Sequence, residues 1–153
     1  MPISPPPSKN GQAVPHDHPE LLNPDLIVRR ISLQWVVDKT GGKRLSSEAF
    51  ECSTDGSGVS LDIAKLIEEK GANVATYVSS PVHVGAIQWT AGQVRGHTNI
   101  VGYDPLPEND CHGAAWPVPY PTTSAQRKAA KRAAKSLIAE ATWCVPIPGV
   151  DVA

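Results

Sequence analysis

The amino-acid sequence predicts an α+β fold, built from a small central mixed sheet and about three helices, of which the longest is C-terminal. Short segments in which apolar residues alternate with other residues predict strands, because successive side chains of a strand point to opposite faces. Segments that begin at a serine or threonine and repeat apolar residues every three or four positions predict helices. Within 153 residues these patterns indicate one domain that combines strands and helices.

Strands are predicted where apolar residues recur at every second position or form a short run. Ile31, Leu33, Trp35 and Val37 follow this alternation, which is typical of a half-buried strand. Several short extended segments are enough to form a central sheet. The further segments predicted to be extended are 74–78, 84–89, 99–103 and 112–116.

Three helices are predicted, each from a capping residue and an apolar stripe. The first covers about 61–70, with Ser60 as its N-cap. A short helix follows Thr90, which has capping-box spacing to a glutamine three residues later. The longest helix covers about 125–142 and begins after Ser124.

Proline is concentrated at the ends of the chain and in one loop. The chain has 15 prolines, and seven of them lie in 1–24, where they leave few amide donors for regular structure. We therefore expect 1–24 to be a disordered arm, 25–145 to be a single α/β domain and 146–153 to be an irregular tail. Five further prolines stiffen the segment 104–122.

The charge and the cysteine content exclude several classes of protein. Fourteen basic and 15 acidic residues give a formal net charge of −1, which excludes a histone-like basic protein. No run approaches the 18 or so apolar residues of a membrane span, and no secretory signal is visible, so no membrane contact is expected. Cys52, Cys111 and Cys144 are too few and too far apart for a disulfide framework, so we expect a reducing, cytoplasmic location.

The predicted C-terminal helix carries a basic stripe. From Ser124 to Thr142 there are five basic residues and one acidic residue, Glu140. Such a face could contact nucleic-acid phosphates, although a solvated helix face is the simpler interpretation because the chain as a whole is not basic. The five basic residues are Arg127, Lys128, Lys131, Arg132 and Lys135.

Two segments have features of ion sites, and neither predicts a bound group. His16-Asp17-His18 could ligate a transition metal, but it lies in the proline-rich arm and matches no common metal spacing. The loop 55–60 precedes a predicted helix N-terminus, where free amides favour an anion, yet it lacks the lysine of a P-loop. We expect no metal and no cofactor.

Three segments, 44–50, 58–62 and 104–112, resemble a pattern in small bacterial proteins of unassigned function. That pattern reads R-(V/L)-S-S-x-x-F, then G-(L/V)-S, then D-P-x-P-x-N-x-x-H, and the similarity covers about 26–116. Asp110 and Cys111 stand where Pro-Ala is more usual. The resemblance implies no activity, but it implies that the serines of the first segment, Ser60 and His112 converge in the fold.

Two functions are consistent with these patterns. The first is a bacterial cytosolic accessory module without catalysis, which contacts an unidentified protein partner. The second is an enzyme or binding domain for a nucleotide or phosphorylated small molecule, since arginine, serine and histidine side chains suit an anionic ligand. The candidate catalytic residues are His112, Ser46 and Arg44, and the candidate ligand-binding residues are Arg30, Ser47, Ser60 and Asn109.

The serine and asparagine candidates also have a purely structural interpretation. Ser46 and Asn109 could cap turns, because short polar side chains bond readily to nearby backbone. A cavity lined by both Ser46 and His112, with an arginine inside it, would favour the second function.

Overall fold

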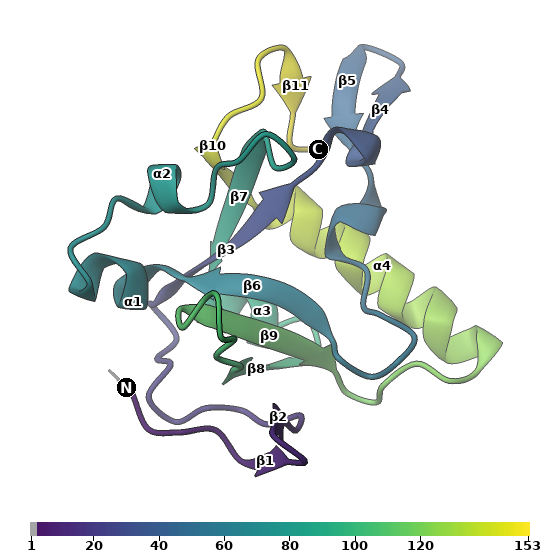
Figure 1. Cartoon of the computed structure of the whole chain (residues 1–153). Helices are drawn as coiled ribbons and strands as arrows, with labels where there is room; N and C mark the ends of the chain where they lie inside the picture. Colours follow the sequence, from purple (N-terminus) through teal and green to yellow (C-terminus); the bar gives the residue numbers. More distant parts are fainter. Residues whose placement is uncertain (1–2) are drawn as a thin grey trace.

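A computed structural model describes residues 3–153, and its centre is a six-stranded sheet (Figure 1). The strand order is β10-β7-β3-β6-β9-β8, and each pair of neighbours is antiparallel. β3 pairs with both β6 and β7, so the centre of the sheet joins segments that are far apart in the sequence. The strands are β3 (Leu26–Ile31), β6 (Val59–Ile63), β7 (Gly85–Thr90), β8 (Asn99–Tyr103), β9 (His112–Pro117) and β10 (Thr142–Val145).

Four α-helices and two 3-10 turns of the described residues accompany this sheet, and the longest helix, α4, runs behind it (Figure 1). The Trp89 indole of β7 donates a hydrogen bond to the Leu137 carbonyl of α4 at 2.7 Å, and both side chains are buried. The predicted α+β class and the long C-terminal helix are confirmed. The helices are α1 (Ala64–Glu69), α2 (Val74–Tyr77), α3 (Ala91–Arg95) and α4 (Ser124–Glu140), and the turns are η1 (Leu33–Trp35) and η2 (Ser47–Phe50).

Two smaller sheets involve the ends of the chain. β1 (Ser8–Lys9) and β2 (Gln12–Ala13) form a short hairpin. β4 (Val36–Lys39), β5 (Gly42–Leu45) and β11 (Val150–Asp151) form a three-stranded sheet in which β11 is parallel to β5. The tail predicted to be irregular therefore contributes a strand, and its Ile147 and Val150 are buried.

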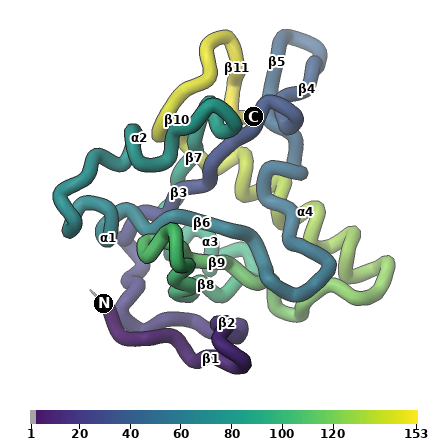
Figure 2. The backbone as a smooth tube through the Cα atoms, in the orientation of Figure 1, coloured from purple at the N-terminus to yellow at the C-terminus, as the bar shows by residue number. Residues whose placement is uncertain are grey.

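Residues 3–24 of the proline-rich arm are packed on the domain, unlike the disordered segment expected from their composition, and 1–2 lie outside the described residues. Figure 2 shows it passing beside β8, and its Leu21 is only 1% exposed. His18 donates its amide to the Val101 carbonyl at 2.9 Å. The Asp17 carboxylate accepts the Val101 amide at 3.0 Å, and Nε2 of His16 accepts the Tyr103 amide at 3.1 Å. Polar side chains of the arm thus bond to the backbone at the edge of the sheet, which explains why the arm is ordered although its regular structure is limited to the β1–β2 hairpin.

The first predicted helix is correct only in its second half. Residues 59–63 form β6, between β3 and β9, and α1 begins at Ala64. Ser60 is therefore a strand residue and not an N-cap. Leu61 and Ile63 are buried in the sheet, because pairing with two neighbouring strands outweighs the local helix signal.

Two predicted strands also differ from the structure. The segment 74–78 contains the helix α2, which begins because the Asn73 side chain accepts the Thr76 amide at 3.1 Å. The alternation over 31–37 is interrupted, since β3 ends at Ile31 and a 3-10 turn follows. A side-chain cap and a tight turn are local hydrogen-bonding features that a period of two does not reveal.

The remaining elements agree closely with their sequence patterns. β7, β8 and β9 lie where extended segments were predicted, and the Thr90–Gln93 capping box opens α3. α4 has its own capping box from Thr123 to Gln126, so its N-cap precedes Ser124. None of the described helices combines the length and the apolarity that crossing a membrane requires.

Candidate functional site

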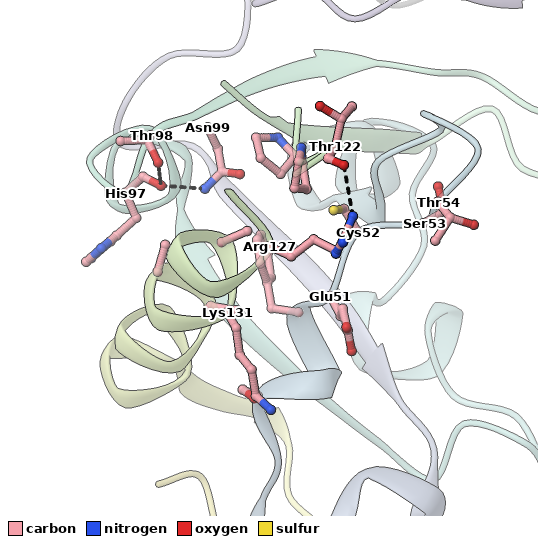
Figure 3. A pocket seen from close by; sticks show the side chains of 17 residues that line it. Glu51, Cys52, Ser53, Thr54, His97, Thr98, Asn99, Thr122, Arg127 and Lys131 are labelled. Atoms are coloured by element: carbon pink, nitrogen blue, oxygen red, sulfur yellow. Dashed lines mark hydrogen bonds between the residues drawn. The ribbon is translucent and has the colours of Figure 1, made fainter. Parts of the chain in front are cut away.

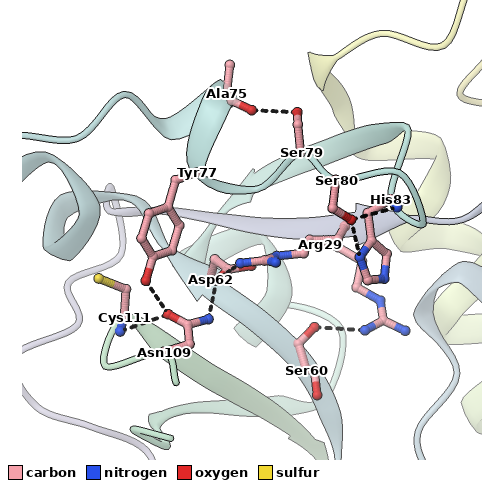
Figure 4. A network of polar contacts seen from close by, with 11 residues as sticks. Arg29, Ser60, Asp62, Ala75, Tyr77, Ser79, Ser80, His83, Asn109 and Cys111 are labelled. Carbon is pink, nitrogen blue, oxygen red and sulfur yellow. Dashed lines mark hydrogen bonds and ion pairs between the residues drawn. The ribbon is translucent and has the colours of Figure 1, made fainter. Parts of the chain in front are cut away.

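Two cavities lie beside the central sheet. One has a volume of ≈370 Å³ and lies between η2 and α4 (Figure 3). The other has a volume of ≈580 Å³ and lies where β3 and β6 diverge, next to the polar network of Figure 4. The second collects most of the candidate residues, and we call it the split cavity. Its lining residues are Arg29, Arg30, Ser60, Leu61, Asp62, Tyr77, His83, Leu106, Glu108, Asn109 and His112.

The split cavity arises because β3 and β6 pair over a short distance. Their register comprises Ile27 opposite Ile63 and Val28 opposite Asp62, whereas β3 pairs with β7 along its whole length. Beyond Val28 the guanidinium of Arg29 donates to the Ser60 carbonyl of β6 at 2.9 Å. A side chain thus bonds across the two strands where the backbone ladder stops.

Asp62 is the centre of the polar network. It is 3% exposed, and Arg30 donates to its two carboxylate oxygens at 2.8 and 3.1 Å. The Asn109 amide donates to the same carboxylate at 2.8 Å. The hydrogen bond that Arg30 donates to Asp62 raises the pKa of Arg30, which stays charged. His112 lies directly opposite Asp62 in the β6–β9 ladder, so both side chains are on one face of the sheet.

Asn109 connects the loop before β9 to α2. Its side-chain oxygen accepts the Tyr77 hydroxyl at 2.6 Å and the Cys111 amide at 3.1 Å. Burial, followed by a side-chain hydrogen bond with Cys111 and the charges nearby, raises the pKa of Tyr77 to about 12, so the phenol keeps its proton and remains a donor. The loop is therefore held in one position relative to Asp62.

Arg29 is the cation of the cavity that has no carboxylate partner among the residues described. Its Nε donates to the Ala49 carbonyl at 2.9 Å, and its guanidinium lies 4.7 Å from the centre of the Trp35 ring. Burial lowers its pKa to about 10, an effect that the charge of Asp62 partly opposes. Arg29 remains protonated at neutral pH, and its positive charge is balanced by no anion within ion-pair distance in 3–153.

Two histidines complete the lining. Nδ1 of His112 donates to the Asp104 carbonyl at 2.8 Å and lies 3.3 Å from the Asp104 carboxylate. Because a carbonyl oxygen only accepts, Nδ1 carries a proton, and Nε2 is the ring nitrogen left for other contacts. Burial, together with Arg30 and Arg29, lowers the pKa of His83, so this ring is neutral at pH 7. A neutral imidazole beside cations can act as a general base toward a bound hydroxyl.

The structure brings together four of the seven candidate residues. Arg30, Ser60, Asn109 and His112 line the split cavity. Of the convergence that the resemblance implies, Ser60 and His112 share this cavity, and the serines of the first segment do not. The other three are elsewhere. Ser46 caps η2 by accepting the Glu48 amide at 3.2 Å, Ser47 lines the cavity beside α4, and Arg44 lies in β5 with a buried Nε that has no described partner.

Sequence reasoning missed Arg29, Asp62, Tyr77 and His83. Asp62 was assigned to the first turn of a helix, which removed it from the site. Reading Ser60 and Asp62 as alternate polar residues of a strand would have placed both on one face. The loop 55–58 leads into β6, so it presents no helix N-terminus to an anion, and its Asp55 carboxylate accepts the Ser57 amide instead.

The metal predictions concern the arm rather than the cavity. His16 and Asp17 bond to the edge of β8, and His18 donates from Nε2 to the Ser4 carbonyl at 2.8 Å. Within 3–153 there is no group of three or more histidine, cysteine or acidic residues arranged to hold a metal ion. These side chains act in packing the arm.

Comparison of the chain with protein-family models, with curated proteins and with solved structures gave no match. The resemblance of 26–116 to small bacterial proteins therefore stays a prediction. Function is inferred from the geometry of the split cavity.

Proposed function

We propose that the split cavity binds an anionic small molecule, in particular a phosphorylated metabolite of up to mononucleotide size. The observation that carries this proposal is the position of Arg29 and Arg30, whose side chains line one cavity although Asp62 neutralises only Arg30. The volume of ≈580 Å³ is in the usual range for small-molecule sites. A ligand phosphate would balance the remaining positive charge.

The residues divide into three roles under this proposal. Arg29 and His83 contact the anion, since neither is committed to a carboxylate. Asp62 and Asn109 position Arg30 and the loop before β9. His112, with Asp104 on its other nitrogen, is the group best placed to accept a proton from a bound substrate.

The accessory-module function stays a prediction, and the exposed basic face of α4 is the feature that favours it. A cytoplasmic location is part of the proposal, because the free thiols of Cys52, Cys111 and Cys144 are stable in a reducing compartment.

Thermal shift and calorimetry with AMP, glucose 6-phosphate and inorganic phosphate test the ligand class, with adenosine and glucose as uncharged controls. A ligand that binds only the folded state at about 100 times its Kd stabilises it by about 2.7 kcal/mol. His83→Gln and Arg29→Lys should each weaken binding about tenfold, because they remove a contact but keep a polar or charged group. Arg132→Gln on α4 is the matched control and should bind like the native protein. If none of the three phosphate compounds gave a saturable response, the proposal would be contradicted.

A further inference from the structure

The cations of α4 form two rows that follow the helix axis. Arg127, Lys131 and Lys135 are four residues apart, as are Lys128 and Arg132, and all five side chains are exposed. None of the five forms an ion pair with an acidic group of the described residues. We call these five residues the α4 cation rows.

This arrangement acts against the stability of the helix that carries it. Like charges four residues apart repel one another on a helix surface. Most of the five cations are in the N-terminal half, where the helix dipole disfavours positive charge. α4 is stable for other reasons, namely its capping box and the burial of Ala134, Leu137 and Ile138. The cation rows are therefore better explained by binding to something outside the chain than by folding.

An apolar cavity opens directly beside these rows. Arg127 and Lys131 are at the α4 side of the ≈370 Å³ cavity in Figure 3, and the 51–54 segment is opposite. The cavity is large enough to hold one leucine- or phenylalanine-sized side chain together with neighbouring main chain. The apolar residues that line it are Phe50, Pro117, Pro121, Ala130, Ala133 and Ala134.

A buried amide supplies a polar contact inside this cavity. Asn99 is 8% exposed, and its NH₂ group donates to the Val94 and His97 carbonyls at 3.2 and 3.0 Å. Its side-chain oxygen has no partner among the described residues and points into the cavity in Figure 3. A backbone N–H of a bound chain would satisfy that acceptor.

We propose that the α4 cation rows and the adjacent cavity dock an acidic segment of a partner polypeptide that carries one apolar side chain. Carboxylates bind the rows, the apolar side chain enters the cavity, and a main-chain N–H bonds to Asn99. The rows extend for nine residues of α4, about 12 Å along its axis, which matches about four residues of extended chain. A small molecule held in the cavity would leave the outer cations unpaired.

Charge and shape favour a peptide over a nucleic acid. The described residues that line the cavity include no Trp or Tyr, and the Phe50 ring is 4% exposed and packs edge-on against Trp89. Base stacking needs an exposed aromatic face. The protein is also not basic as a whole, with a formal charge of −1.

Fluorescence anisotropy with the full chain tests the proposal. The probe is a labelled ten-residue peptide of glutamates and aspartates with one central leucine, at about 50 mM salt, where exposed charges are weakly screened. Replacing the leucine of the peptide with serine should weaken binding about tenfold, because the cavity loses an apolar side chain. Lys128→Gln/Arg132→Gln should weaken it about tenfold. Ala130→Leu fills the cavity and should abolish the difference between the leucine and serine peptides.

Lys39→Gln/Lys43→Gln is the matched control, since it removes the same charge from the β4–β5 hairpin and should leave the affinity unchanged. Circular dichroism of each variant shows whether α4 is intact. Tighter binding of a single-stranded RNA of equal charge would overturn the proposal in favour of a nucleic-acid face. Equal binding of the leucine and serine peptides to the native protein would also overturn it, as would no binding of the acidic peptide.

Discussion

The two cationic regions of the molecule differ in how their charges are bonded. In the split cavity, Arg30 is paired with Asp62, and Arg29 bonds to two backbone carbonyls and stacks on Trp35. On α4 the cations are exposed and have no acidic partner among the described residues. Arg29 and Arg30 thus hold neighbouring strands together, whereas among the five α4 cations only Arg127 makes a described hydrogen bond, to the Thr122 carbonyl at 2.9 Å.

This difference predicts opposite effects of substitution on stability, and the largest is at Asp62. Asp62→Ala leaves the buried donors of Arg30 and Asn109 without an acceptor, so we expect the free energy of unfolding to fall by about 3 kcal/mol. Urea denaturation followed by circular dichroism measures it. Glu108→Ala, in the same cavity, is the control and should change stability by less than about 0.5 kcal/mol. If Asp62→Ala and Glu108→Ala lowered stability equally, the bonded charges of the split cavity would have no special stabilising role, and the two cationic regions would not differ in this respect.

Arg29→Ala should have the next largest effect. The carbonyls of Ala49 and Ser60 lose their donor, and Trp35 loses the cation that stacks on it, so a loss of about 2 kcal/mol is expected. Hydrogen exchange should speed up most in β6, next to the split. Arg29→Lys keeps the charge but not the forked geometry, and an undiminished stability in that variant would show that the bonds across the strands are unimportant.

On α4, substitution of a cation should raise the free energy of unfolding instead of lowering it. Lys128→Glu replaces a like-charge pair with Arg132 by an opposite-charge pair in the favourable orientation, and it places an anion nearer the helix N-terminus. We expect a gain of about 0.5 kcal/mol in the free energy of unfolding, visible as a small rise in Tm. The same variant should weaken binding of the acidic peptide. A loss of stability would indicate that Lys128 has a structural role.

The smallest expected effect is a pH dependence from His83. Burial and the two arginines hold its pKa below the ordinary value, so the unfolded chain takes up a proton at a higher pH than the folded one. Stability from this group is complete above about pH 6.5 and decreases as the pH falls toward the folded pKa. Because the ring is partly exposed, the change is on the order of a few tenths of a kcal/mol. The urea midpoint should fall more between about pH 7.5 and 5.5 for the native protein than for His83→Gln. An equal fall in the two proteins would contradict the expectation.

The sequence was informative where local chemistry decides the structure. Alternating apolar residues predicted β7, β8 and β9, and capping-box spacing predicted the start of α3. The loop around Asn109 and His112 was proposed as a candidate from its resemblance to a short sequence pattern. Each of these features depends on neighbours within a few positions in the chain.

Other features depend on contacts between distant segments. Residues 61–63 have a helical pattern, yet they form a strand because β3 and β9 supply backbone partners on both sides. The arm is ordered because the edge of β8 offers bonds to His16 and Asp17, and composition does not reveal that edge. Ser46 and His112 do not share a cavity, so a constellation that required both is not formed.

By itself the sequence determined the fold class, the long basic helix and four of the residues that line the split cavity. Only the tertiary structure decided that Arg29, Asp62, Tyr77 and His83 join them, and that an apolar cavity lies beside α4. The physical reason is that propensity, capping and periodicity act over a few residues. A cavity instead forms where strands from different parts of the chain stop pairing, and pairing is set by long-range burial and hydrogen bonding.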